Sequence, residues 1–497
     1  MEKHVLNSSS APASRLPQRI LLVLFLLSLS LLNPWIRGDG VGYYAFLRAP
    51  LIQHNLDFEK DYQSANASFR EARLDEQGRP LDLFRTRTGH LDNHFTVGPA
   101  LLWSPFLIVT HLGVLLARAF GASVLADGFS APYRLAMALA TAFYGFCGLL
   151  LAFHITRQYV AEKWALLATI AIWWGSSFPV YMYFNPSWSH AHSAFAVALF
   201  LWYWHETRQS RSTRQWIFLA AITGLMLNVY YANGMVLMVV VVEAIRQYYA
   251  AVRSPVAGES AERTETARPF SELLVRHILF SITLIICLLP TLITRQIVYG
   301  NPFQSGYLPL KDWLWRSPAL LSVLFSANHG LLSWTPLLLL AIIGVFLFWR
   351  QKPLVGGPLL AALIAFYLFI SCYPDWAGIS SYGNRFFVSL TPIFIIGLGV
   401  LLGRIGLLFN KYRNSFAVLS AALAIFVFWN AGLIFQWGSH LIPARGPISF
   451  SEMIRNQFFV VPKNISSDLE KYLFKRHAMM QQIEERDVEQ LRKEPPQ

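Results

Sequence analysis

Strongly apolar segments recur along most of this chain and are separated by short polar links. A membrane-spanning helix needs about 20 mostly apolar residues to cross about 30 Å of hydrocarbon. Segments that approach or reach this length cover residues 17–36, 97–119, 132–155, 164–184, 188–205, 215–232, 233–249, 276–298, 331–349, 354–373, 386–403 and 415–437. The pattern predicts an all-α polytopic membrane protein built as a bundle of transmembrane helices.

Two polar regions interrupt this pattern. Residues 36–93 form a long polar stretch after the first apolar segment, and residues 438–497 form a polar tail. We expect residues 1–437 to form one transmembrane module, in which residues 36–131 are a large first extracytoplasmic loop. Acidic and basic residues alternate at helical spacing in the tail, which predicts a small capping helix or a partly disordered end.

The positive charges of the short links predict the orientation. Lys and Arg gather in the links at 157–163, 208–214, 246–276, 350–352 and 404–413, whereas the links at 185–187 and 228–233 carry none. The positive-inside rule places the basic links in the cytoplasm. With Arg15 and Arg19 also inside, the alternation holds only if the segment 97–119 does not cross the membrane. Pro99 and Pro105 favour a non-spanning juxtamembrane segment there. We therefore expect about eleven spans, a cytoplasmic N-terminus and an extracytoplasmic tail.

Composition supports this class of protein and excludes others. Only 14% of the residues are charged and 55% are hydrophobic, whereas a soluble domain carries about 25% charged residues. The net charge of +13 comes largely from the links, so membrane lipid is the expected counter-charge and nucleic acid is excluded as a partner. Cys147, Cys287 and Cys372 are widely spaced in apolar segments, which indicates neither a disulfide framework nor a metal cluster.

Asp39 is the first candidate catalytic residue. It follows the first apolar segment, at the head of the large loop, and has glycine on both sides. Glycine lets the backbone approach a ligand closely, and a carboxylate held there can deprotonate an acceptor hydroxyl or amine. Tyr43 and Tyr44 add interfacial rings that can stack on a sugar or an isoprenoid. The alternative is that Asp39 only caps a helix.

Further candidates lie in other links expected outside the membrane. Asp92 and His94 precede the segment 97–119, where they can orient Asp39, hold a metal or simply cap a helix. Arg134 opens the next span and can pair with a lipid phosphate or snorkel to the interface. His190 lies in an uncharged outer turn, where it can line a polar cavity or sit at the interface.

The link after 354–373 combines an acid, a base and aromatic rings. It contains Asp375, Tyr382 and Arg385, and we expect Asp375 and Arg385 to pair, either in a phosphosugar site or in a loop salt bridge. The chain has no Walker loop, no dinucleotide fingerprint and no Cys/His metal spacing. Nothing in it therefore supports a nucleotide-driven pump.

Three motifs resemble the GT-C superfamily of membrane glycosyltransferases, in particular the family 39-like protein mannosyltransferases and lipid A aminoarabinose transferases. They are Gly38-Asp39-Gly-Val-Gly-Tyr43-Tyr44-Ala, His94-Phe-Thr-Val-Gly-Pro99-Ala-Leu-Leu-Trp103 and Tyr133-Arg134-Leu-Ala-Met-Ala. The resemblance covers roughly the first two hundred residues. Many relatives carry a second acid after the first, where this chain has Gly40, and the His-Pro-Pro-Leu-like segment is replaced by Val97-Gly98-Pro99.

The resemblance implies a GT-C-like bundle with juxtamembrane helices in the first loop. It implies transfer of a sugar from a polyprenyl-phosphate donor to an extracytoplasmic lipid, glycan or protein acceptor, with Asp39 as general base. Arg134 would steady the departing lipid phosphate. The expected location is the bacterial inner membrane, no cofactor is certain, and the need for a divalent cation stays open. The alternatives are a transporter or flippase of lipid-linked sugars and a non-catalytic scaffold of the same fold.

Overall fold

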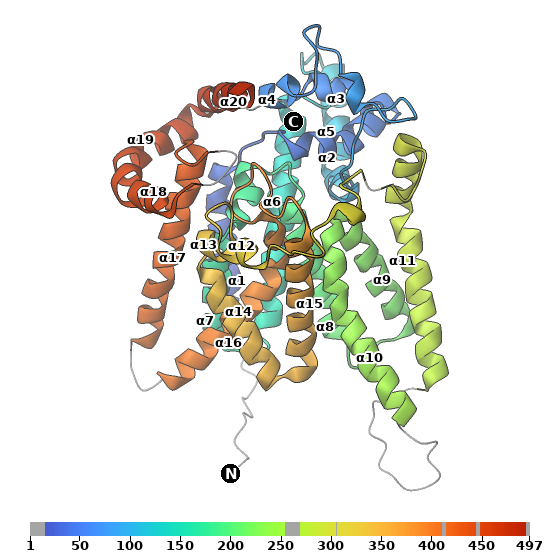
Figure 1. Ribbon diagram of the computed structural model, residues 1–497, viewed down its shortest axis with the longest axis vertical. Coiled ribbons are helices and arrows are strands. Elements are labelled where there is room, and N and C mark those ends of the chain that lie inside the picture. Colours follow the sequence, from blue (N-terminus) through green and yellow to red (C-terminus); the bar gives the residue numbers. More distant parts are fainter. Residues whose placement is uncertain (1–14, 254–268, 305, 410–413, 444–447, 494–497) are drawn as a thin grey trace.

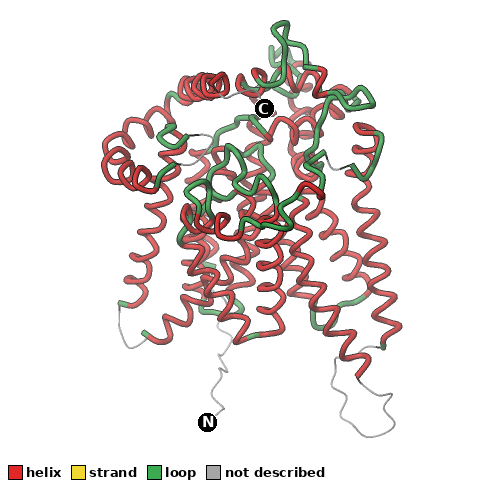
Figure 2. The backbone as a smooth tube through the Cα atoms, in the orientation of Figure 1, coloured by secondary structure: helices red, strands yellow, loops and turns green. Residues whose placement is uncertain are grey.

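The computed structural model describes residues 15–253, 269–304, 306–409, 414–443 and 448–493. Helices dominate the described part of the chain, and its β pairing is confined to two isolated bridges, Leu74 with Pro80 and Arg85 with Leu91. Most of the long helices run roughly side by side (Figure 1), and the loops gather at one end of the bundle (Figure 2). The prediction of an all-α polytopic fold is confirmed.

Each apolar segment predicted from the sequence contains a helix. The helices are α1 (Leu16–Ser28), α5 (Gly98–Ala119), α6 (Ala131–Thr156), α7 (Glu162–Trp174), α8 (His190–Thr207), α9 (Thr213–Val229), α10 (Met238–Arg253), α11 (Phe270–Tyr299), α14 (Leu337–Gln351), α15 (Pro353–Cys372), α16 (Thr391–Leu408) and α17 (Ser415–Gly438). By length and composition, 7 helices in the described residues can cross a membrane, and α1 and α14 are shorter apolar helices.

Burial separates a central helix from peripheral ones. In α16, 13 of the 18 residues are buried, whereas α11 and α17 have 5 buried residues each. The centre is tight because Gly344 of α14 and Gly397 of α16 lie backbone to backbone, and a Cβ on Gly344 would stand 1.8 Å from the Gly397 carbonyl oxygen. Small residues of this kind let membrane helices approach closely, whereas an exposed apolar face is suited to lipid.

The polar stretch and the tail meet at the end of the bundle where the loops gather. The stretch forms the short helices α2 (Asp39–Arg48), α3 (Glu59–Gln63) and α4 (Ala67–Glu71). The tail forms α18 (Phe450–Arg455), α19 (Val461–Phe474) and α20 (Arg476–Lys493), and α20 lies beside α4 at the top of Figure 1. The tail was expected to be one capping helix or partly disordered; instead its described residues form these helices.

A buried ion pair fixes the far end of α2. Arg48 donates to both carboxylate oxygens of Asp61, at 2.6 and 2.5 Å, and both side chains are almost fully buried. Burial raises the pKa of Asp61, although the hydrogen bonds and charge of Arg48 oppose that rise. Because a buried charge without its partner is costly, this pair anchors the helix that carries Asp39 at its first turn.

Helix α5 lies against α6 in an antiparallel hairpin. Trp103 donates to Thr141 at 2.8 Å, and His111 lies 2.6 Å from the hydroxyl of Tyr133. Later residues of α5 therefore contact earlier residues of α6, as in an antiparallel pair. Pro105 lies within α5 without ending it. Asn93, five residues before this helix, and Gly128, nine residues after it, both contact α2.

Asn93 donates to the Gly42 carbonyl at 2.9 Å, close to the start of α5. Tyr44 donates to the Gly128 carbonyl at 2.6 Å, beyond its end. Both flanks of α5 are therefore bound to α2, which lies in one place at the loop-rich end of the molecule.

Candidate functional site

A cavity of about 910 Å³ opens between the loop-rich end of the bundle, the polar stretch and the tail helices. Six of the residues predicted from the sequence line it: Asp39, Tyr43, His94, His190, Asp375 and Arg385. This volume lies in the range typical of ligand sites in proteins.

Asp39 and Arg385 form an ion pair at the wall of this cavity. Asp39 opens α2 directly after Gly38, whose φ of 51° is a left-handed conformation that glycine adopts without strain. Arg385 opens the short helix η7 (Arg385–Leu390), and its Nη1 donates to Asp39 Oδ2 at 2.6 Å. The Asp39 side chain remains 31% exposed, against 14% for the Arg385 side chain. Asp39 is therefore oriented by a fixed cation and still accessible from the cavity.

Trp188 supports both partners of this ion pair. The Arg385 guanidinium lies 4.8 Å from the centre of the Trp188 ring, and the indole donates to the Arg37 carbonyl at 3.0 Å. A Cβ on Gly38 would stand 3.3 Å from the same ring. The planar guanidinium stacks well on an aromatic face, so Trp188 holds the cation and packs directly under the turn that carries Asp39.

One donor of Arg385, its Nε, is buried without a hydrogen-bond partner among the described residues. A buried donor without a partner is unusual and often marks a ligand position. Arg385 also lines the cavity, where its guanidinium charge can pair with an anion such as a phosphate.

Tyrosines form much of the remaining wall. Tyr43 is buried, and its hydroxyl accepts a hydrogen bond from Ser189 at 2.9 Å. Burial, and then the negative charge of Asp39, raise the pKa of Tyr43, so its phenol stays protonated. Further aromatic residues line the same cavity: Tyr230, Tyr231, Tyr307, Trp313 and Tyr373. Rings with polar tips suit a ligand that combines a sugar with an isoprenoid.

His94 lies in the cavity wall, and Asp92 stands behind it. The His94 ring is 4.1 Å from the Phe95 ring and 4.9 Å from the Tyr307 ring, and its Nδ1 lies 3.5 Å from Asp92 Oδ2. Tyr299 also donates to Asp92. Burial alone would raise the pKa of Asp92, but these hydrogen bonds from His94 and Tyr299 lower it on balance. Asp92 is therefore a carboxylate that orients His94.

Four predicted residues lie outside the cavity lining: Tyr44, Asp92, Arg134 and Tyr382. Tyr44 is buried against the 120–130 loop, and Tyr382 is buried with its hydroxyl 2.8 Å from Asn430 Oδ1. Arg134 is exposed near the start of α6. The cavity therefore contains Arg385, and not Arg134, as a cation beside Asp39.

The predicted pairing of Asp375 with Arg385 is wrong. Among the described ion pairs, Arg385 binds Asp39, 346 residues away along the chain. Asp375 lines the same cavity but opens a tight turn in which Gly378 donates to its carbonyl at 2.8 Å. Because η7 folds back toward α2, the nearer carboxylate in sequence is not the one that the guanidinium reaches.

Sequence reasoning missed several lining residues. Trp188, Tyr230 and Tyr231 are in links without Lys or Arg, and Arg37 precedes the Asp39 motif directly. The pair Tyr230-Tyr231 could have been recognised as a candidate for the site, because the Asp39 motif contains a similar pair, Tyr43-Tyr44. The lining residues of the tail, such as Tyr472 and Asp487, gave no sequence signal, since charged helices are usually solvated.

The described ranges contain no candidate metal-binding cluster. No three His, Cys, Asp or Glu side chains come together there in a way that could hold an ion. Asp39 already has a cation, Arg385, at hydrogen-bond distance.

Comparison with known proteins gives matches at the level of structure only. No family model matches the chain, and no curated protein matches its sequence. Among solved structures, ArnT from Cupriavidus metallidurans in the apo state is 14% identical, with a TM-score of 0.46, over 85% of this chain and 71% of its own. The oligosaccharyltransferase of Archaeoglobus fulgidus is similar with a TM-score of 0.43 and 14% identity, over 91% of this chain and 55% of its own.

The same archaeal enzyme, AglB, is also similar in its complex with an inhibitory peptide and a dolichol-phosphate. That match has a TM-score of 0.45 and 13% identity, over 88% of this chain and 56% of the other. The chain thus spans little more than half the length of the archaeal oligosaccharyltransferase. These similarities to solved structures, at 13–14% identity, extend over most of this chain.

Proposed function

We propose that this protein is a membrane glycosyltransferase that moves a sugar from a polyprenyl-phosphate donor to an extracytoplasmic acceptor. The observation that carries the proposal is the ion pair between Asp39 and Arg385 on the wall of an aromatic cavity at the loop-rich end of the bundle. Such a cavity offers a base, a cation and stacking surfaces within one enclosure. These are the groups needed for attack on a sugar that leaves a lipid phosphate.

In the proposed reaction, Asp39 is the general base. The acceptor oxygen or nitrogen forms a bond to the anomeric carbon while the bond from that carbon to the phosphate oxygen breaks. Asp39 takes the proton of the acceptor, and the polyprenyl phosphate departs with the bonding electrons. Arg385 stabilises the negative charge that develops on the phosphate, where fixed cations are most effective. Its position in the cavity lining beside Asp39 supports this role.

The other lining residues have supporting roles in this proposal. Tyr43, protonated and close to Asp39, holds the sugar by stacking and hydrogen bonding. His94, oriented by Asp92, faces the same space from the start of α5. His190 and Asp375 complete the polar part of the lining. We assign Arg134 to the membrane interface and not to the phosphate, because it is exposed and outside the cavity.

We also propose that α5 does not cross the membrane. The segments before and after it are both bound to α2, through Asn93 with Gly42 and through Tyr44 with Gly128. These contacts support a helix whose two ends lie on the same side of the membrane. Eleven spans then leave the active site and the tail outside. Single cysteines at Gly78 and Gly121 should both react with an impermeant maleimide added from outside. Labelling of one site alone would mean that α5 crosses.

The function is tested by supplying membranes that contain the protein with radiolabelled polyprenyl-phosphate sugars. Matched membranes without the protein are the control. Protein-dependent transfer of label to lipid, glycan or protein supports the proposal and identifies the acceptor class. Absence of transfer across a range of donors, together with protein-dependent movement of the intact lipid-linked sugar between leaflets, would favour the flippase instead.

A further inference from the structure

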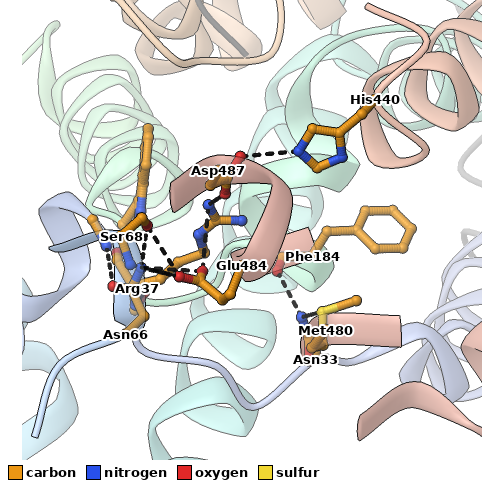
Figure 3. Close-up of polar contacts among 12 residues, drawn as sticks. Asn33, Arg37, Asn66, Ser68, Phe184, His440, Met480, Glu484 and Asp487 are labelled. Atoms are coloured by element: carbon orange, nitrogen blue, oxygen red, sulfur yellow. Dashed lines mark hydrogen bonds and ion pairs between the residues drawn. The ribbon is translucent and has the colours of Figure 1, made fainter. Parts of the chain in front are cut away.

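Helix α20 contacts the turn that carries Asp39, although it lies more than four hundred residues away in the sequence. Figure 3 shows the polar contacts between this helix and the polar stretch. Arg37 Nη2 donates to Asp487 Oδ2 at 2.6 Å, and the same nitrogen lies 3.7 Å from Glu484 Oε1. The side chains of all three are at most 18% exposed. Short, half-buried charge pairs of this kind are stronger than surface pairs.

Glu484 also reaches the residue before Asp39 through one intermediate side chain. The backbone N–H of Gly38 donates to Asn66 Oδ1 at 3.1 Å. The Asn66 amide nitrogen in turn donates to both oxygens of Glu484, at 3.1 and 2.9 Å. Ser68 donates to Glu484 from its backbone and its hydroxyl, both at 3.0 Å. Glu484 therefore fixes the orientation of the amide that holds the Gly38 turn.

Asp487 closes a second chain of contacts. Its Oδ1 lies 2.9 Å from His440 Nε2, beyond the end of α17, while its Oδ2 accepts from Arg37. The same helix supplies part of the cavity wall through Met480 and Ile483. The sulfur of Met480 also accepts from Asn33 at 3.3 Å. One face of α20 thus contacts the cavity, the segment after α17 and the Asp39 turn together.

We propose that Glu484 and Asp487 are positioning residues, through which the C-terminal helix holds the Asp39 turn in its catalytic geometry. This inference rests on the proposed function for its effect on catalysis, but its structural part does not. The hydrogen bonds and the ion pair of this network end on Gly38 and Arg37, the two residues that precede the base. The helix is therefore a component of the site and not a separate capping domain.

The first experiment measures hydrogen–deuterium exchange of the purified full-length protein. Glu484→Ala removes the acceptor of Asn66 and Ser68, whereas Glu485→Ala, on the exposed face of the same helix, removes none of these contacts. Exchange of the 37–41 amides should rise in Glu484→Ala and stay unchanged in Glu485→Ala. Glu484→Gln keeps one acceptor oxygen and should fall between them.

The second experiment measures sugar transfer by the same variants. Glu484→Ala should lower kcat about tenfold, because a small displacement of a catalytic group is expensive, while KM for the donor stays near that of the wild type. Glu485→Ala should leave both unchanged. A merely structural role would instead lower the unfolding temperature and raise exchange throughout the bundle.

Each outcome decides one of the two proposals. Unchanged exchange at 37–41 in Glu484→Ala overturns the positioning role, and so does a rise that is spread evenly over the helices. Faster exchange confined to this turn supports the role even if the wild type transfers no sugar. In that last case the proposed function fails and the structural inference stands.

Discussion

A side chain at Gly40 should displace the base, and the structure indicates how to restore it. A Cβ on Gly40 would stand 2.0 Å from the hydroxyl oxygen of Ser187, 2.5 Å from its Cβ and 3.1 Å from its carbonyl oxygen. Ordinary contacts between such atoms are about 3.5–4.0 Å. Gly40→Ala therefore forces α2 and the 185–189 turn apart by about 1 Å or more.

The expected magnitude follows from this overlap. Overpacking of a buried site costs about 1–3 kcal/mol, which lowers the unfolding temperature of the protein in detergent. Because Asp39 is the neighbouring residue, a shift of about 1 Å should also reduce transfer up to about a hundredfold. Ser187→Gly removes the two closest atoms, so the double variant Gly40→Ala/Ser187→Gly should regain most of both losses.

The assay is thermal unfolding and sugar transfer by the four members of this double-mutant cycle. Gly113→Ala is the matched control, because its Cβ would meet nothing within 4 Å in α5; that change should be neutral or stabilise by up to about 1 kcal/mol. Coupling between positions 40 and 187 should be favourable by about 1–3 kcal/mol. Wild-type stability of Gly40→Ala, or no recovery in the double variant, would refute the close approach on which the argument depends.

Two further predictions concern the charged groups. Arg385→Ala should lower kcat by about 10²–10³ through lost stabilisation of the phosphate charge, and Arg134→Ala should change it less than about twofold because it lies outside the cavity; equal losses would return the phosphate role to Arg134. Burial raises the pKa of Asp487, but the hydrogen bond from His440 and the charge of Arg37 outweigh burial and hold this pKa below 3.8. The Asp487 carboxylate therefore stabilises the folded protein above this pKa, and the stabilisation is lost as the pH falls through it. The difference in unfolding temperature between wild type and Asp487→Asn should shrink as the pH falls below 3.8; a difference that grows there would contradict the assignment.

The apolar pattern predicts most of the fold because membrane helices are specified locally. Each predicted segment contains a helix, since about 20 apolar residues in lipid must satisfy their own backbone hydrogen bonds. The candidate base was also readable, because Asp39 is the acid that follows the first span and has glycines on both sides. These features depend on neighbours in sequence.

The rest of the site depends on partners that are distant in sequence. Arg385 and Asp39 meet across 346 residues, and the local loop suggested Asp375 instead. Glu484 and Asp487 belong to a charged helical pattern that indicates a solvated surface, yet both are buried against the polar stretch. Periodicity gives the face of a helix but not the element against which that face packs.

The central claim is that Asp39 is the base of a sugar transfer, and one comparison tests it most directly. Membranes with wild type, Asp39→Asn or Asp82→Asn at matched protein levels are given a radiolabelled polyprenyl-phosphate sugar pool. Asp82 is a control because it is a fully exposed acid in the same polar stretch. We predict transfer by wild type and Asp82→Asn and none by Asp39→Asn. Equal transfer by all three would remove Asp39 from the mechanism.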